Sequence, residues 1–170
     1  MRDAAFASGI GAGWDGAVAG YYGGPAAYHV WPAGDWRRFP GRRKLPIWVA
    51  GFNGGQEGAA AARALHELGV PPHCYTAVDM EGRVDRTYLE HFGAVMAAAS
   101  YRVWVYGQAS TVFGNPPLDG YWVADYAGVG PFMYPGPAGA EVRATQYASG
   151  TLFDRSTVKD WTYWFGRWWR

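Results

Sequence analysis

Two carboxylic acids separated by one residue, Asp79 and Glu81, follow the apolar run at residues 75–78. If this run is a β-strand, alternate side chains share a face, so both carboxyl groups point to the same side, about 7 Å apart along the backbone. Like charges this close raise the pKa of one group, and the pair then holds one protonated and one ionised carboxyl at neutral pH. Glycoside hydrolysis uses such a pair. Two solvated acids at a corner between a strand and a loop have the same spacing.

The composition indicates one globular domain, residues 1–170, that is unusually rich in aromatic side chains. Hydrophobic residues make up 49% of the chain and charged residues 17%, which is typical of a folded domain. The 10 Trp, 12 Tyr and 8 Phe exceed what a core of this size needs, so we expect some of them to line a cleft that stacks on sugar rings or binds a protein. The alternative is that they fill a core that has few Leu and Ile.

Charge, cysteine and histidine content argue against several other classes of protein. A formal net charge of +1 gives no general attraction to nucleic acid or to an anionic membrane. The single cysteine, Cys74, excludes an internal disulfide framework and is expected to be a buried thiol. The four His are scattered without a metal-binding spacing, so no metal and no cofactor are expected. We also expect no membrane span and no signal peptide, because no apolar run is long enough for either.

Short apolar segments bounded by Gly and Pro predict a series of strands. Residues 1–16 are rich in Gly and Ala and are predicted to be irregular. The predicted strands are residues 17–22, 27–31, 46–52, 73–81, 102–107, 120–126, 142–147 and 152–154.

Two helices of ordinary length are predicted between these strands. Asn53 and Gln56 have the spacing of a capping box, which predicts that a helix begins there. A second helix is predicted to begin near Asp85, and a single helical turn is expected near residues 110–113. The many Gly and Pro at residues 128–139 exclude a full helix in that segment.

Strands that alternate with helices predict an α/β fold with a parallel sheet, and about eight strands suggest a closed barrel. A full-size (β/α)8 barrel needs about 200 to 250 residues. We therefore expect a compact, irregular TIM-like (β/α)8 barrel with several outer helices reduced to loops. Catalytic groups of such barrels stand at the C-terminal ends of the strands, where the prediction places Asn53, Asp79, Glu81, Gln108, Asp125 and Gln146.

An ordered set of segments resembles the family 25 glycoside hydrolases. The set consists of Val78-Asp79-Met80-Glu81 followed by residues 103–107, 121–126, 145–147 and 153–156. Members of that family are lysozymes (N-acetylmuramidases), which cleave peptidoglycan on an irregular barrel. The chain is similar in particular to the related glycoside-hydrolase-like domains of GC-rich bacteria and of phage tail or lysis proteins.

The resemblance implies roles for individual residues. Glu81 matches the general acid that protonates the leaving glycosidic oxygen, and Asp79 matches the carboxylate that stabilises the transition state or orients the reacting N-acetyl group. Asp154 matches a further acid near the last strand. With the residues at strand ends, the expected substrate-binding set is Tyr22, Asn53, Tyr106, Gln108, Trp122, Asp125, Tyr126, Gln146 and Tyr147.

One difference from the lysozymes concerns their first strand, which ends in another Asp. The first predicted strand here leads into residues 20–25 without an acid, and Asp15 lies too early and Asp35 too late. Loss of one acid from a charge-coupled site could abolish hydrolysis and leave a cleft that only binds sugar.

Three functions therefore stay open. The first is hydrolysis of peptidoglycan or a similar amino-sugar glycan. The second is non-catalytic carbohydrate binding on the same barrel. The third is a structural module in a larger assembly such as a phage tail, where the aromatic C-terminal segment, residues 157–170, contacts a protein partner unless it packs on the barrel itself. All three imply an extracellular, cell-wall-associated or virion-borne protein.

Overall fold

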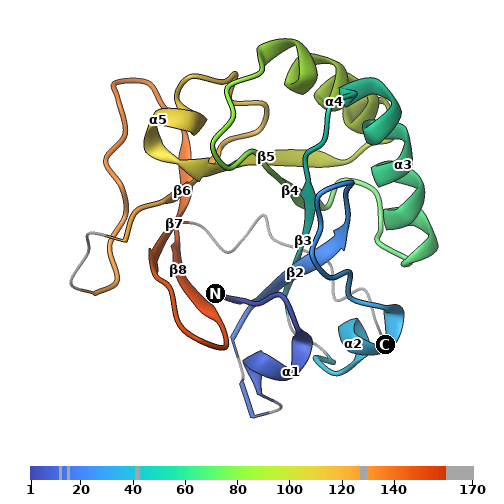
Figure 1. Cartoon of the computed structure of the whole chain (residues 1–170), viewed down its shortest axis with the longest axis vertical. Helices are drawn as coiled ribbons and strands as arrows, with labels where there is room; N and C mark the ends of the chain where they lie inside the picture. Colours follow the sequence, from blue (N-terminus) through green and yellow to red (C-terminus); the bar gives the residue numbers. More distant parts are fainter. Residues whose placement is uncertain (12, 15, 41–42, 127–129, 160–170) are drawn as a thin grey trace.

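The computed structural model describes residues 1–11, 13–14, 16–40, 43–126 and 130–159. Within these ranges eight strands close into a barrel in chain order (Figure 1). The strands are β1 (Arg2–Asp3), β2 (Val18–Gly23), β3 (Lys44–Val49), β4 (Tyr75–Asp79), β5 (Arg102–Gln108), β6 (Tyr121–Ala124), β7 (Val142–Ala148) and β8 (Asp154–Val158). The predicted compact barrel is confirmed.

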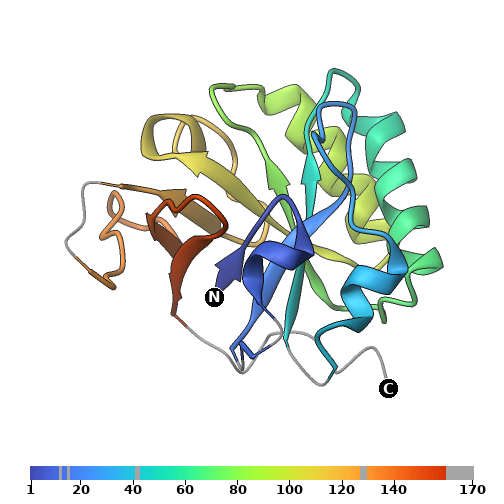
Figure 2. The same cartoon turned by 60° about the horizontal axis from the view of Figure 1, so that its bottom comes forward.

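The outer layer of helices is uneven, as expected for a chain of this length. The two long helices, α3 (Gly54–Glu67) and α4 (Arg86–Ala98), lie side by side on one flank of the barrel (Figure 1, Figure 2). They approach closely at Gly54, where an added Cβ would lie 2.0 Å from the carbonyl oxygen of Tyr88. The remaining helices are the single turns α1 (Ala7–Ile10), α2 (Ala33–Arg37) and α5 (Ala109–Val112).

Both long helices begin at the predicted residues. The Asn53 side chain accepts a hydrogen bond from the Gln56 amide at 3.1 Å and caps α3. Asp85 caps α4 in the same way, by accepting from the Tyr88 amide at 2.9 Å. Each cap pairs one of the backbone N–H groups that the first helical turn leaves without a partner.

The direction of the last strand differs from a regular parallel barrel. From β1 to β7, neighbouring strands are parallel, whereas β8 runs antiparallel to both β7 and β1. Because β8 is reversed, its first residue, Asp154, lies at the same end of the barrel as the last residues of the parallel strands. The last strand was predicted at residues 152–154, whereas in the structure it begins at Asp154 and ends at Val158.

The prediction of an irregular N-terminal segment was wrong, because the chain enters the barrel at once. β1 is held by a hydrogen bond from the Arg2 amide to Ala17 O at 3.0 Å and by one from the Ser156 amide to Met1 O at 2.9 Å. The segment 17–22 is thus the second strand. Residues 27–31, predicted as a strand, form a loop that returns to β2 through a bond from the Trp31 amide to Tyr21 O at 2.8 Å.

Aromatic side chains occupy both locations that the composition allows. Several Trp fill the core without contact with solvent, whereas four aromatic rings are largely exposed: Phe6, Tyr28, Phe52 and Tyr126. Residues 160–170, most of the aromatic C-terminal segment, lie outside the described residues, so the prediction made for them stays a prediction. Within the described ranges, no helix combines the length and the apolar character that a membrane crossing requires.

Candidate active site

Four carboxylic acids stand at one end of the barrel. Asp3 ends β1, Asp79 ends β4, Glu81 follows two residues later, and Asp154 begins β8. Asp3 is the acid at the end of the first strand. The prediction that this acid is missing was wrong, because the strand used to search for it is β2.

The phenol of Tyr21 interacts electrostatically with all four acids. Burial raises its pKa most, and the charges of four carboxylates raise it further: Asp79, Asp3, Glu81 and Asp154. All four acids are thus within electrostatic range of one phenol, although they are as far apart in the sequence as residues 3 and 154.

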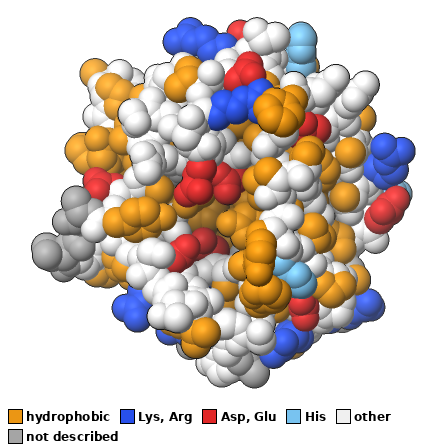
Figure 3. All heavy atoms as spheres, viewed as in Figure 1, with side chains coloured by type: hydrophobic (Ala, Val, Ile, Leu, Met, Phe, Trp, Pro, Cys, Tyr) orange, Lys and Arg blue, Asp and Glu red, His pale blue; other side chains and the backbone are white. Residues whose placement is uncertain are grey.

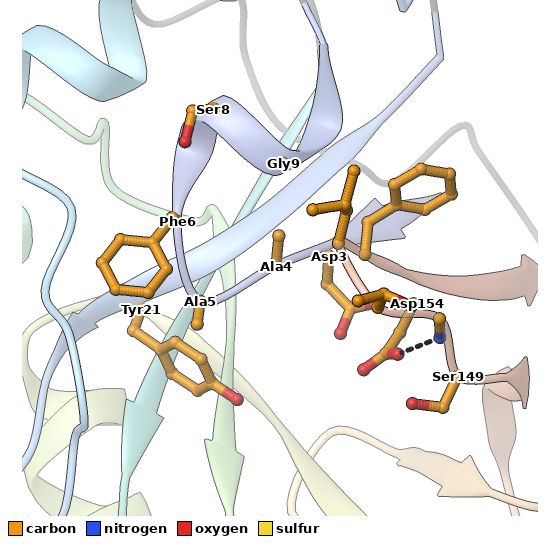
Figure 4. A pocket seen from close by; sticks show the side chains of 13 residues that line it. Asp3, Ala4, Ala5, Phe6, Ser8, Gly9, Tyr21, Ser149 and Asp154 are labelled. Atoms are coloured by element: carbon orange, nitrogen blue, oxygen red, sulfur yellow. Dashed lines mark hydrogen bonds between the residues drawn. The ribbon is translucent and has the colours of Figure 1, made fainter.

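A cleft of about 460 Å³ opens beside this phenol. Its walls are the segment that follows β1 and the turn between β7 and β8, and Tyr21 of β2 lines it too. Figure 4 shows the side chains of Asp3 and Asp154 close to each other at one side of the cleft, with Tyr21 across from them. On the surface, a hollow on this face has acidic side chains on two of its sides and hydrophobic side chains around it (Figure 3).

Asp79 is the buried member of the Asp79/Glu81 pair. Its side chain is only 7% exposed. Burial raises its pKa to about 7, with a smaller upward contribution from the Glu81 charge, while the hydrogen bond from the Glu81 amide acts in the opposite direction. That amide donates to Asp79 Oδ1 at 3.0 Å and holds the turn between the two acids. Asp79 can therefore gain and lose a proton near neutral pH.

Glu81 differs from Asp79 because its side chain reaches solvent. The Tyr106 hydroxyl donates to Glu81 Oε1 at 3.4 Å. One of the two acids is thus nearly buried at the strand end, and the other stands above it at the open side of the site.

Asp3 is the most strongly perturbed of the four acids. It is 7% exposed, and its Oδ1 has no hydrogen-bond partner among the described residues. Burial raises its pKa well above the usual value, and repulsion from Asp154 raises it further. Asp154, by contrast, accepts a hydrogen bond from the Gly150 amide at 3.2 Å.

The floor of the site is a hydrogen-bonded layer inside the barrel. Gln146 is fully buried, and its Oε1 accepts from the hydroxyls of Tyr106 and of Tyr126, the latter at 3.3 Å. Trp122 packs against Tyr106 with a centroid distance of 4.5 Å and donates to Ser156 Oγ at 3.2 Å. Because Trp122 has no exposed surface, it supports the site from below and offers no face to a sugar.

Other residues predicted to bind substrate lie elsewhere. Tyr22 alternates with Tyr21 along β2, is buried, and packs against Trp48 at 5.4 Å. Tyr147 is half-buried and lies at an irregularity in the pairing of β7 with β8, between Gln146 and Ala148.

Of the three other polar residues predicted at strand ends, only Asp125 contacts the floor layer, and it does so through its backbone. Asn53 caps α3, and Gln108 is exposed where β5 passes into α5. The Asp125 amide donates to Gln146 O at 2.9 Å. Among the described residues, no group of His, Cys, Asp and Glu has the arrangement of a metal site.

Sequence reasoning missed two residues of the site, Asp3 and Tyr21. Asp3 belongs to a strand of two residues, which is too short to show an alternating pattern. Tyr21 and Tyr22 are the same residue type, so the sequence could not indicate which of them faces inward.

Comparison with known proteins gives matches among solved structures. No protein-family model and no curated protein matches the sequence. A bacterial lysozyme from Streptomyces coelicolor superposes with a TM-score of 0.61 at 16% identity, covering 95% of this chain and 93% of that chain. A family 25 glycosyl hydrolase from Bacillus anthracis gives a TM-score of 0.61 at 12% identity over 85% of this chain and 78% of that chain. The chain has the fold of the family 25 lysozymes.

A further solved structure of the same fold belongs to an uncharacterized protein. An uncharacterized protein from B. stearothermophilus matches with a TM-score of 0.72 at 17% identity, covering 93% of this chain and 94% of that chain. Identities this low establish the fold alone. The function of this lysozyme-fold chain has to be argued from its own residues.

Proposed function

We propose that this protein is a lysozyme-like glycosidase that hydrolyses peptidoglycan or a related amino-sugar polymer at the cell wall. The proposal rests on one observation: the acids at the ends of β1 and β4 and at the start of β8 stand together at one end of the barrel. Four carboxyl groups at one end of the barrel cost stability, because like charges repel and buried carboxyls lose hydration. Active sites retain such arrangements because the chemistry needs them.

The two carboxyl groups that follow β4 suit the two proton transfers of a neighbouring-group mechanism. The carbonyl oxygen of the substrate's 2-acetamido group attacks C1 while the bond from C1 to the leaving oxygen breaks. Glu81, at the open side of the site, gives its proton to that oxygen, and Asp79 takes the proton from the acetamido nitrogen. A pKa of about 7 for Asp79 matches the role of a base that works near neutral pH.

Water completes the reaction by reversing both proton transfers. It adds to C1 and gives a proton to Glu81 while the bond from C1 to the acetamido oxygen breaks, and Asp79 returns its proton to the acetamido nitrogen, which restores the acetamido group. Burial raises the pKa of Asp3, and the Asp154 charge raises it further, so whenever Asp3 holds its proton the repulsion among the four acids is smaller.

Binding without hydrolysis is the second candidate function. The observation that favours it is the burial of Asp79, which is only 7% exposed. A carboxyl group that a sugar cannot approach would leave a cleft that holds glycan and does not cut it.

Loss of turbidity of cell-wall suspensions tests the proposal. The Glu81→Gln variant keeps the size of an exposed side chain, so the fold is unchanged, and we expect it to lose activity by about 100-fold or more. Glu90→Gln, an exposed position on α4, is the matched control and keeps full activity. Equal activity of Glu81→Gln and wild type would remove Glu81 from the mechanism. Wild-type protein that binds walls without clearing them would favour the second candidate.

A further inference from the structure

Three aromatic rings from two loops gather beside the acidic cleft, at Phe6, Tyr28 and His29. The rings of Phe6 and His29 are 4.4 Å apart between centroids with an interplanar angle of 30°, and Tyr28 meets Phe6 edge-on at 6.0 Å and 87°. Tyr28 is 83% exposed and Phe6 is 46% exposed. Aromatic surface left in water at this scale marks a contact site more often than an accident of packing.

The cluster is held in place by a buried tryptophan. The Trp31 indole is 1% exposed and donates hydrogen bonds to Ala4 O at 3.2 Å and to Ala5 O at 2.9 Å. These two carbonyl groups lie between Asp3 and Phe6, so Trp31 joins the loop that carries Tyr28 to the loop that carries Phe6. The Trp31 ring packs directly on Gly20, where an added Cβ would lie 2.5 Å from it.

The cluster is continuous with the candidate active site. Phe6 lines the same cleft as Asp3 and Asp154, and Figure 4 shows its ring at the edge of that cleft, next to Tyr21. Only two residues separate Phe6 from Asp3. A polymer that lies across the four acids and continues past Tyr21 would therefore meet Phe6 and Tyr28 next.

We propose that Phe6 and Tyr28 form an accessory sugar-binding site, which holds a pyranose ring of the same glycan strand at least one unit away from the bond that is cut. This inference rests on the proposed function. It concerns the sugar unit of the substrate that lies beyond the cleft. The C–H face of a pyranose ring packs on the face of an aromatic ring, and two rings at 87° offer one face and one edge to it.

The charges nearby select a neutral sugar over an anionic ligand. Asp3 and Asp154 line the adjoining cleft, and negative carboxylates repel phosphate groups and acidic polymers. N-acetylglucosamine carries no charge and presents both hydroxyl groups and an apolar face. Because Trp31 fixes both loops before binding, little conformational entropy is lost when the sugar docks.

The test measures how affinity depends on the length of the glycan. Calorimetric titrations use β-1,4-linked N-acetylglucosamine oligosaccharides of two to six units with the full chain carrying Glu81→Gln, so that nothing is cleaved. We expect affinity to rise with length and expect Tyr28→Ala to weaken binding of the longest oligosaccharide by about 10-fold, the scale of one aromatic stacking contact. The chain with Glu81→Gln alone is the parent for these variants. Tyr28→Phe, which keeps the ring, and Val30→Ala, at an exposed apolar neighbour, should both bind as this parent does.

The outcomes separate this inference from the proposed function. Equal length dependence in the parent and in Tyr28→Ala overturns the accessory site, whether or not the wild type clears cell walls. Wild-type protein that clears walls while the parent binds no oligosaccharide also overturns it and leaves hydrolysis standing. If the parent binds no oligosaccharide and the wild type does not clear cell walls, both the accessory site and the proposed function are overturned. Because Tyr28 is 83% exposed, the Tyr28→Ala variant is expected to fold normally.

Discussion

Asp3 and Asp154 are direct cross-strand partners in the antiparallel pair of β1 and β8. This pair closes the barrel, so the step that joins the first strand to the last also brings two carboxyl groups together. Opposed like charges destabilise a strand pair, and here burial, together with the Asp154 charge, raises the pKa of Asp3. Closure of the barrel and assembly of the site are therefore the same structural event.

Asp79 should make the stability of the protein fall as the pH rises. Its pKa is raised to about 7 when folded and is about 3.9 in an unfolded chain, so the folded state binds more protons between these values. Stability is full below about pH 4 for this group and is lost progressively up to about pH 7. Urea unfolding of wild type and Asp79→Asn at pH 5 and pH 8 measures this loss.

The Asp79→Asn variant should lose less stability between pH 5 and pH 8 than wild type does, by roughly 1.4 kcal/mol for each pH unit over which Asp79 titrates. Asp35→Asn, in a weak surface ion pair with Arg38 at 3.9 Å, is the control and should behave as wild type. Identical pH dependence of wild type and Asp79→Asn would show that the Asp79 carboxyl is hydrated in the folded protein.

Glu57 should be essential for stability although it lies outside the site. This buried carboxylate accepts hydrogen bonds from Gly51 N, Asn53 N, Trp48 Nε1 and Tyr88 Oη at distances between 2.7 and 3.3 Å. Burial alone would raise its pKa, but these bonds together lower it. In Glu57→Gln an amide N–H₂ group must face at least one donor, which costs about 2 to 3 kcal/mol.

Chemical denaturation compares Glu57→Gln with Glu67→Gln, an exposed position at the end of the same helix. The control should stay within about 0.5 kcal/mol of wild type. A Glu57→Gln variant as stable as the control would mean that the four donors find other partners.

Replacing Gly54 by alanine should separate α3 from α4. The new Cβ would lie 2.0 Å from Tyr88 O, a backbone atom that cannot move without shifting the helix. We expect a loss of about 2 kcal/mol or more, visible as a lower melting temperature. Gly34→Ala in α2 has nothing within 4 Å of the added atom and should be neutral or slightly stabilising. Equal melting temperatures for the two variants would contradict the close approach of the helices.

The hydroxyl of Tyr106 should matter for activity more than for stability. Its single O–H group can donate to either Gln146 or Glu81, so Tyr106→Phe leaves the ring packed on Trp122 and removes the link between the floor and the exposed acid. We expect activity to fall about 10-fold with little change in the melting temperature. Tyr101 precedes β5 and therefore lies at the opposite end of the barrel from the acids. Tyr101→Phe, which loses a hydrogen bond from its hydroxyl to Val70 O at 3.0 Å, should keep its activity. Full activity of Tyr106→Phe would remove the floor layer from the mechanism.

The central part of the fold follows from local patterns in the sequence. The segment from β3 to α4 could be predicted because a buried strand, a helix cap and a helical apolar stripe each give a signal within a few residues. The same segment contains Asp79 and Glu81. These two acids stand at the C-terminal end of β4, where the sequence places them, and their role in the site stays a prediction.

The closing pair of strands could not be predicted in the same way. β1 has two residues and β8 is reversed, and their pairing joins residues more than 150 positions apart. No local pattern reports contacts of this range. The inward face of β2 was equally hidden, because the choice between Tyr21 and Tyr22 depends on register and not on residue type.

The most direct test of the central claim, that the four acids form the active site of a glycan hydrolase, is mass spectrometry of purified peptidoglycan after incubation with the protein. We predict new glycan fragments with free reducing ends, which fall to background in Glu81→Gln and Asp79→Asn and persist in Glu90→Gln. Wild-type protein that binds the glycan and releases no fragment between pH 5 and pH 8 would contradict the claim.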